Sequence, residues 1–463
     1  MKRLIIVVYY ILCGSYLWGQ HDNHCQKLVN MVMADSCFQS IEYMEKYKEG
    51  ILPSEETMAL YKFKMFGFMN QPDSSIYYLE KILKDYPSIY GGKGSPAETF
   101  FINTLLDLYY KNADYSKSLE LYTSIEKGLK SSSLTENAKW VDIQLEAIRK
   151  AKQTLLLHSK HSKPQVVNVA NREETLIPLI KQSPLIAIPI RCNGTNLQTW
   201  VDTGWGSHLF MTKKTAEKCG LQVAPMEIGK DSIMVNGRRV AGGISVVDSL
   251  YIGDLLVTDI PAFIANNEYI SFLPDSVVSD KKQKAKYDSV FGFSDVILGL
   301  PLLKMFGSIG FDWNKGEMRI KLKSKILPLK EKPNMFLAQD ALFGHLSING
   351  NSFVGLLDTG ASVGGIWVSP SFNRLHKKDT ILLSSEKTRT NLGIGIYDYA
   401  KYKIVQNPNV LLNNEKVALE GDVWVWEKEL DPLYKDGLIG LPFLKKIGKK
   451  VTFDFVNMRL TTE

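Results

Sequence analysis

Two short stretches decide the fold: WVDTG at Trp200–Gly204 and LLDTG at Leu356–Gly360. In each stretch, apolar residues favour a buried strand, and an aspartate follows where the strand reaches a turn. Glycine has no Cβ, so it lets the backbone pass close to the carboxylate and point an N–H toward it. The threonine hydroxyl can hydrogen-bond to the facing loop. One Asp-Thr-Gly is a common turn, whereas two in one chain indicate a duplicated structure.

Other features repeat in the same order. Asn193-Gly194 and Asn349-Gly350 precede the two motifs by the same number of residues. Later, ILGLPLLKMFG at Ile297–Gly307 is matched by LIGLPFLKKIG at Leu438–Gly448, and Phe-Asp and then Met-Arg follow each of them. This repetition predicts two related β lobes and a pseudo-two-fold axis that brings the two aspartates together.

The region after the first third of the chain reads as strands. Runs such as Leu185–Ile190, Val246–Ile252 and Val451–Phe455 are rich in β-branched or aromatic residues, and Asn-Gly pairs separate several such runs. We therefore predict an all-β region, with lobe 1 at residues 166–325 and lobe 2 at residues 326–463.

The preceding residues, 20–165, have helical periodicity. Leu60–Pro87 and Leu105–Leu129 resemble one another: each has a helix, a short polar turn and a second amphipathic helix. They resemble the tetratricopeptide repeat, although the repeat length varies and the loop Gly91–Ser95 interrupts it. We predict a solenoid-like α-α module, followed by a polar linker at His158–Glu174.

The N-terminus predicts export. Lys2 and Arg3 precede the short apolar run Leu4–Cys13, and small and polar residues follow, so residues 1–19 have the pattern of a cleaved signal peptide. No other segment is long and apolar enough to predict a membrane span in the mature chain. We expect the mature protein in the periplasm, at the cell surface or in the medium.

Four cysteines remain after such a cleavage, and they fall into two sequence-local pairs. An oxidising compartment permits the disulfides Cys25-Cys37 and Cys192-Cys219, and buried free thiols are the alternative. Their spacing does not fit a metal site. The net charge of +7 is spread over Lys-rich loops without interleaved aromatic residues, so we expect no nucleic-acid surface.

Two adjacent aspartates can hydrolyse a peptide bond. Carboxylates about 3 Å apart cannot both ionise, so they share one proton. The ionised member takes a proton from a bound water, and the protonated member polarises the scissile carbonyl. This chemistry requires no cofactor, so we expect none, and we expect no metal.

These motifs make residues Leu176–Glu463 resemble the aspartic protease superfamily, in which pepsin-like enzymes fuse two lobes and retroviral-type enzymes pair two chains. The lobe lengths resemble bacterial single-chain, retropepsin-like members. The resemblance implies a bilobal all-β fold with pseudo-two-fold symmetry, in which Asp202 and Asp358 are catalytic. It also implies supporting roles for the residues around them: Thr203, Gly204, Thr359, Gly360, Gly299 and Gly440.

Two features depart from that family or are unclear. Members usually carry Ser or Ala after the glycine, whereas lobe 1 has Trp205, which either points away from the carboxylates or blocks the site. A flap over the substrate has two candidates: Arg238–Ile244, with Gly242 and Gly243, and Asn391–Tyr397, with Gly393 and Gly395. Ordinary β turns are the alternative for each.

The sequence thus predicts an exported aspartic endopeptidase that acts as a monomer on a peptide or protein substrate. A catalytically inactive peptide-binding or scaffold protein that keeps the lobes is the alternative. The helical module offers a surface for a protein partner, and it either recruits substrate or inhibits the cleft.

Overall fold

The computed structural model describes most of the chain, which forms two compact units. One unit contains the residues up to Lys163 together with Phe336–Ala338, and the other contains Pro164–Met335 and Gln339–Glu463. The predicted signal peptide lies outside the described residues, which are 23–47, 54–92, 95–131, 138–183, 185–225, 232–235, 238–266, 279–291, 294, 296–324, 326, 332–362, 364–376, 383–393, 396–419, 421–429 and 434–463.

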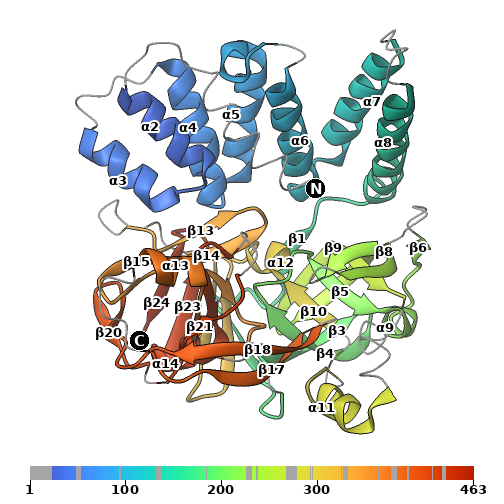
Figure 1. Cartoon of the computed structure of the whole chain (residues 1–463). Helices are drawn as coiled ribbons and strands as arrows, with labels where there is room; N and C mark the ends of the chain where they lie inside the picture. The colour runs from blue at the N-terminus through green and yellow to red at the C-terminus, as the bar shows by residue number, and fades with distance from the viewer. Residues whose placement is uncertain are drawn as a thin grey trace. The chain divides into compact units, whose positions relative to one another are not determined.

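The first unit is helical, as predicted. From α4 onward, each helix packs against the next, and the helices run side by side in Figure 1. Their identity as tetratricopeptide repeats stays a prediction. The helices are α2 (Asn23–Met33), α3 (Cys37–Tyr47), α4 (Glu55–Phe68), α5 (Pro72–Asp85), the 3-10 helix η1 (Pro87–Tyr90), α6 (Pro96–Lys111), α7 (Tyr115–Ser131) and α8 (Ala138–His158).

Side chains at the helix ends explain where these helices begin. The hydroxyl of Ser95 accepts a hydrogen bond from the backbone N–H of Glu98 at 3.1 Å, so Ser95 caps α6 and ends the Gly91–Ser95 loop. A hydrogen bond joins the polar turn at the start of α5, which contains Asp73, to the polar turn after α6, which contains Asn112. The side-chain amide of Asn112 donates to the Asp73 carboxylate at 2.7 Å. The α4–α5 and α6–α7 hairpins are therefore connected at corresponding positions.

Lobe 1 opens the β unit, and its first strand corrects the sequence prediction. Strand β1 lies within the predicted linker and pairs with Leu255–Thr258 of β9. The strands and helices of this part are β1 (Gln165–Asn168), β2 (Thr175–Pro178), β3 (Ala187–Cys192), β4 (Thr195–Asp202), β5 (Leu209–Thr212), α9 (Lys213–Lys218), β6 (Ala224–Pro225), β7 (Ser232–Val235), β8 (Arg238–Ile252), β9 (Leu255–Ala265), α11 (Lys281–Phe291), β10 (Val296–Gly299), α12 (Leu300–Leu303), β11 (Ser308–Asp312) and β12 (Glu317–Lys321).

Lobe 2 repeats this order. In each lobe a hairpin (β3–β4 or β14–β15) leads to the Asp-Thr-Gly motif, and its second strand pairs in parallel with β10 or β22. The elements are β13 (Met335–Ala338), β14 (Ala341–Ile348), β15 (Asn351–Asp358), β16 (Ile366–Val368), α13 (Pro370–Leu375), β17 (Lys387–Gly393), β18 (Ile396–Ile404), β19 (Val410–Leu412), β20 (Glu415–Val417), β21 (Val423–Trp426), β22 (Gly437–Gly440), α14 (Leu441–Lys446), β23 (Lys450–Asp454) and β24 (Arg459–Thr462).

A third sheet joins the two lobes. Its order is β2-β12-β11-β23-β24, and the equivalent strands β11 and β23 pair antiparallel about the Gly310–Thr452 position. Because the two Phe-Asp repeats lie on these strands, the pairing places the pseudo-two-fold axis between them. This confirms the predicted bilobal fold of the β region.

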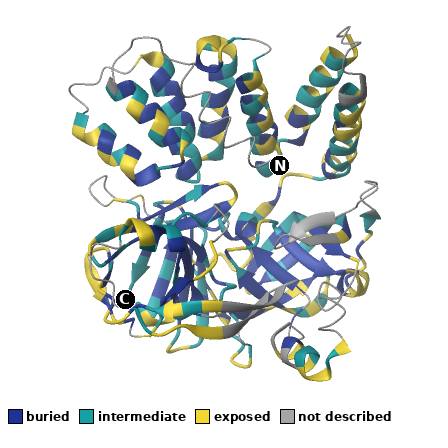
Figure 2. Ribbon diagram, in the orientation of Figure 1, coloured by how far each residue is buried: buried dark blue, intermediate teal, exposed yellow. Residues whose placement is uncertain are grey.

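The core of the β unit consists of buried apolar residues on the strands of these sheets, whose ribbons are dark blue where the residues are buried in Figure 2. Phe353, Phe443 and Phe453 are at most 1% exposed. Within the described residues, no helix combines the length and apolarity that a membrane crossing requires.

Candidate active site

Each aspartate ends a buried strand that is held by a parallel neighbour. Asp202 is the last residue of β4 and lies opposite Gly299 of β10, and Asp358 ends β15 opposite Gly440 of β22. The strands are fixed by their apolar residues, for example Val201 and Leu357, which are 1% and 0% exposed. The two carboxyl-bearing loops therefore leave the core at equivalent positions of the two lobes.

The threonines of the two motifs bind each other's loops. The Thr203 hydroxyl donates to the backbone carbonyl of Leu357 at 2.8 Å and accepts from the N–H of Thr359 at 3.0 Å. The Thr359 hydroxyl makes the mirrored pair, donating to the Val201 carbonyl at 2.8 Å and accepting from the N–H of Thr203 at 3.0 Å. All four bonds are buried, so they fix the two aspartate loops against each other.

The glycines bring the carboxylates together. The N–H of Gly204 donates to Asp202 Oδ1, and that of Gly360 donates to Asp358 Oδ1, both at 2.8 Å. A Cβ on Gly204 would lie 2.6 Å from Asp358 Cγ, and one on Gly360 would lie 2.5 Å from Asp202 Oδ2. Each carboxylate thus lies against the opposite glycine, and a hydrogen bond joins the two carboxyl groups.

This environment favours one bound proton. Burial raises the pKa of Asp202 well above its usual value, and the charge of Asp358 raises it further, although the N–H groups of Gly204 and Gly360 act in the opposite direction. Burial also raises the pKa of Asp358, while its hydrogen bond with Asp202 and the N–H groups of Gly360 and Ala361 lower it. Both aspartates nevertheless keep part of their surface exposed.

Residues 188–302 match a family model described as Aspartyl protease. The matched stretch runs from β3 to α12 and contains both the Asp202 motif and Gly299. It identifies a protease-like domain in this part of the chain, and such a domain implies a peptide substrate. No curated protein matches the sequence.

Gly299 and Gly440 lie close against the backbone of the two aspartate loops. A Cβ on Gly299 would lie 2.1 Å from the carbonyl oxygen of Ser207, and one on Gly440 would lie 2.8 Å from that of Ala361. Side chains at either position would push the aspartate loop away. This close approach of backbones supports the buttressing role that the family resemblance implies for both glycines.

The indole of Trp205 is held within lobe 1. Its Nε1–H donates to the Ser207 hydroxyl at 2.6 Å, and its ring packs edge-on against Phe210 at 4.9 Å between centroids. Its backbone carbonyl accepts from the N–H of Leu300 at 2.9 Å, as that of Ala361 does from Leu441 at 2.8 Å. Both lobes thus make the same backbone contact, and the indole N–H is directed to Ser207.

The flap candidates occupy different positions. Gly242 and Gly243 lie in the interior of β8, paired with Ala265 and Ile264 of β9, so they do not form a turn. Asn391–Tyr397 spans the β17–β18 hairpin, in which Gly393 pairs with Ile396, and Gly395 lies outside the described residues. A flap role stays a prediction for these glycines.

Neither predicted disulfide is formed in the structure. Among the described residues, the four cysteines Cys25, Cys37, Cys192 and Cys219 are buried and form no disulfide. A buried cysteine packs as a small apolar side chain, so each of these residues fits the core without a bridge. Sequence spacing alone could not decide between thiols and bridges.

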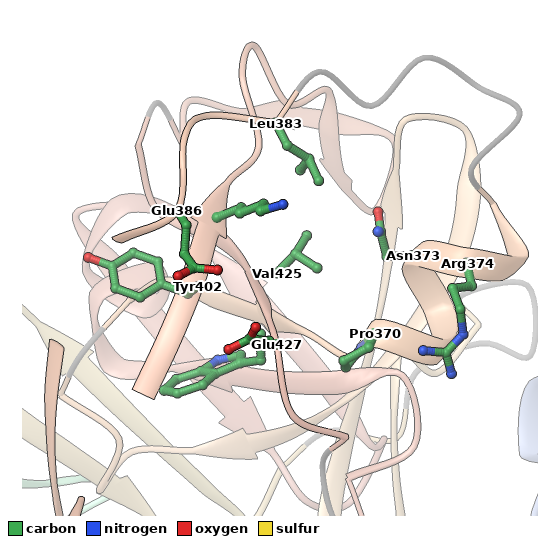
Figure 3. A pocket seen from close by; sticks show the side chains of 10 residues that line it. Pro370, Asn373, Arg374, Leu383, Glu386, Tyr402, Val425 and Glu427 are labelled. Atoms are coloured by element: carbon green, nitrogen blue, oxygen red, sulfur yellow. The ribbon is translucent and has the colours of Figure 1, made fainter. Parts of the chain in front are cut away.

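A pocket of about 190 Å³ lies on lobe 2, between α13 and strands β18 and β21 (Figure 3). Neither aspartate lines it, so it is distinct from the paired carboxyl groups. The pocket-lining residues are Pro370, Asn373, Arg374, Leu383, Glu386, Tyr402, Lys403, Val425, Trp426 and Glu427.

Within the described part of the chain, no group of three or more His, Cys, Asp or Glu residues is arranged to hold a metal ion.

Proposed function

We propose that the chain is an aspartic endopeptidase in which Asp202 and Asp358 share one proton and activate a water molecule. The observation that carries this proposal is the hydrogen-bonded carboxyl pair, held by four reciprocal threonine bonds between two duplicated lobes. Hydrolysis of a peptide bond by water requires a base and an acid close together, and one shared proton supplies both.

In the reaction, the ionised carboxylate takes a proton from the water as it attacks the scissile carbonyl carbon. The protonated carboxyl donates a hydrogen bond to the carbonyl oxygen, where negative charge develops. The tetrahedral intermediate then collapses, and a proton passes to the leaving nitrogen as the C–N bond breaks. The pair titrates as a unit, so either aspartate can hold the proton in the resting state.

The geometry favours an enzyme over an inactive binding protein. Two carboxyl groups with raised pKa values, held against each other by the fold, lower its stability, and such perturbed groups cluster at functional sites. The Nε1–H of Trp205 is bonded to Ser207, and the aspartates beside it keep exposed surface. We therefore favour the first of the two orientations open for Trp205, in which its indole points away from the carboxylates.

Three further features belong to the proposal. Residues 1–19 direct export, so the enzyme acts outside the cytoplasm. The helical unit recruits the protein substrate, because stacked helix pairs present an extended surface. Both aspartates belong to one chain, so the enzyme acts as a monomer.

Substitution of either aspartate tests the proposal. Asp202→Asn and Asp358→Asn should each lower kcat for an unfolded protein substrate by about 10³-fold or more, because each removes one member of the proton-transfer pair. Asp288→Asn is the matched control, since Asp288 is an exposed residue of α11 paired with Lys284.

Circular dichroism should show the same folded state in all three variants. Wild-type turnover in Asp202→Asn would exclude lobe 1 from catalysis. Purified wild-type protein that digests nothing, with or without pepstatin, would favour the inactive binding protein.

A further inference from the structure

Lobe 1 contains a pair of buried thiols in contact. Cys192 ends strand β3, directly before the Asn193-Gly194 turn, and Cys219 caps the C-terminus of α9. Their side chains are joined by a hydrogen bond, and the residues are 0% and 4% exposed. The contact joins the hairpin that leads to Asp202 with the helix that follows the Asp202 loop.

The fold does not require thiols at these positions, as lobe 2 shows. The residue that precedes Asn349-Gly350 is Ile348, which is 1% exposed, and the C-cap of α13 is His376. The turn itself is held in the same way in both lobes: Asn193 accepts from the N–H of Ser249 at 3.0 Å, and Asn349 accepts from that of Asn409 at 2.8 Å. An aliphatic residue therefore fills the hairpin position as well as cysteine does.

Polar contacts hold the end of α9 against the hairpin beside the thiols. The amide of Asn193 donates to the carbonyl of Cys219 at 3.4 Å, and the hydroxyl of Thr195 donates to the carbonyl of Lys218 at 3.1 Å. The backbones that carry the two sulfurs are thus fixed on either side of the thiol contact. A disulfide needs this kind of proximity, because it tolerates little backbone movement.

We propose that Cys192 and Cys219 form a disulfide when the chain meets a disulfide oxidant, and that this bond braces lobe 1 around Asp202. The bond closes a loop that contains β4, the aspartate loop, β5 and α9. It therefore removes conformational freedom from the unfolded chain in the part that carries half of the carboxyl pair. The proposal does not depend on peptidase activity.

The reaction is ordinary thiol–disulfide exchange. The Cys219 thiolate attacks one sulfur of the oxidant and expels a thiolate, which gives a mixed disulfide. The Cys192 thiol then loses its proton and attacks the Cys219 sulfur, which expels the second thiolate of the oxidant. Two protein thiols are oxidised by two electrons, and one oxidant disulfide is reduced to two thiols.

The surroundings of the two thiols favour this order. The hydrogen bond with Cys192 lowers the pKa of the Cys219 thiol, and Thr195 and Lys218 lower it further, although burial opposes them. The same hydrogen bond and burial raise the pKa of Cys192. Because both sulfurs are buried, the exchange takes place while the lobe folds or opens locally, and the finished bond is protected from reductants.

Refolding of the full chain provides the test. Reduced, denatured protein is refolded with glutathione and glutathione disulfide, denatured again with iodoacetamide but without reductant, and digested for peptide mass mapping. We expect the Cys192 and Cys219 peptides to be linked, two hydrogen atoms lighter than their sum, and released by dithiothreitol. Full alkylation of both cysteines, or a link from either one to another cysteine, would overturn the proposal.

Variants make the test specific. Cys192→Ser and Cys219→Ser should each remove the linked peptide, whereas Cys25→Ser/Cys37→Ser, the matched control in the helical unit, should retain it. Refolding with dithiothreitol in place of the glutathione mixture should lower the Tm of the control by about 5 °C and leave the Tm of Cys192→Ser/Cys219→Ser unchanged. Equal responses of the two proteins, or loss of the link in the control, would refute the brace.

Discussion

Replacing Thr203 by valine removes two of the four hydrogen bonds that fix the aspartate loops against each other. Valine has nearly the shape of threonine but no hydroxyl. The Leu357 carbonyl loses its donor at 2.8 Å, and the Thr359 N–H loses its acceptor at 3.0 Å. Both stranded groups lie in a buried site, because Thr203 is 4% and Thr359 0% exposed.

The expected cost follows from these two contacts. Each lost hydrogen bond is worth about 1 kcal/mol net, and a buried polar group left without a partner costs about 1–3 kcal/mol. We therefore expect Thr203→Val to lower the free energy of unfolding of the β unit by about 3 kcal/mol. The symmetry predicts the same loss for Thr359→Val, and kcat should fall by about 10²-fold as the carboxylates lose their alignment.

Urea denaturation followed by tryptophan fluorescence measures the stability, and amide hydrogen exchange at residues 203 and 359 measures the local effect. Thr203→Ser keeps the hydroxyl and should stay within about 1 kcal/mol of wild type. Thr199→Val removes a buried hydroxyl from β4, the strand that leads to Thr203; in the described structure this hydroxyl donates to the neighbouring Trp200 carbonyl at 3.2 Å. If Thr203→Val proves no more harmful than Thr199→Val, the reciprocal bonds do not hold the lobes together.

Three other expectations concern pH, packing and the helical unit. Because burial raises the pKa of both aspartates, we expect kcat/KM to peak at mildly acidic to neutral pH. Ala361→Ser adds a hydroxyl that stabilises the charged carboxylate, lowers the pKa of Asp358 and should move the acidic limb of the pH–rate profile down by about one pH unit. If that limb does not move, the hydrogen-bond donors to the charged carboxylate lie elsewhere. Gly299→Ala should lower the free energy of unfolding, measured by urea denaturation, by about 2–3 kcal/mol, because its Cβ would lie 2.1 Å from a backbone oxygen. Gly206→Ala places its Cβ in open space and should be nearly neutral. Equal effects of the two substitutions would refute the supporting role of Gly299. Deleting residues 20–165 should slow cleavage of the natural substrate and spare short peptides, and a large gain on short peptides would instead show inhibition.

The duplication made the centre of the molecule predictable. Two Asp-Thr-Gly motifs followed by two Gly-Leu-Pro segments admit few arrangements other than two lobes about an axis, and the parallel pairing of Asp202 with Gly299 and of Asp358 with Gly440 agrees with that reading. The contact between Thr203 and Thr359 could also be expected, because a side chain close to the pseudo-two-fold axis must face the equivalent residue of the other lobe.

Features that depend on distant segments were not predictable. Gly242 and Gly243 look like turn residues in the sequence, but β9 pairs along them, and a Cβ on Gly242 would lie 2.3 Å from the Ile264 carbonyl oxygen. Strand β1 arises in a polar segment because β9, far along the chain, supplies its partner. The orientation of Trp205 depends on Ser207 and Phe210, which only the folded turn brings within its reach.

Because β11 and β23 pair within one chain, the two aspartates cannot be separated by dilution. A site assembled from two independent half-chains would lose activity per molecule at low concentration, since the halves would dissociate. Here each chain carries its own partner lobe at a high effective concentration, so turnover per chain should be constant however dilute the protein becomes. Under the proposed function, accumulation of the chain therefore cannot switch its activity on.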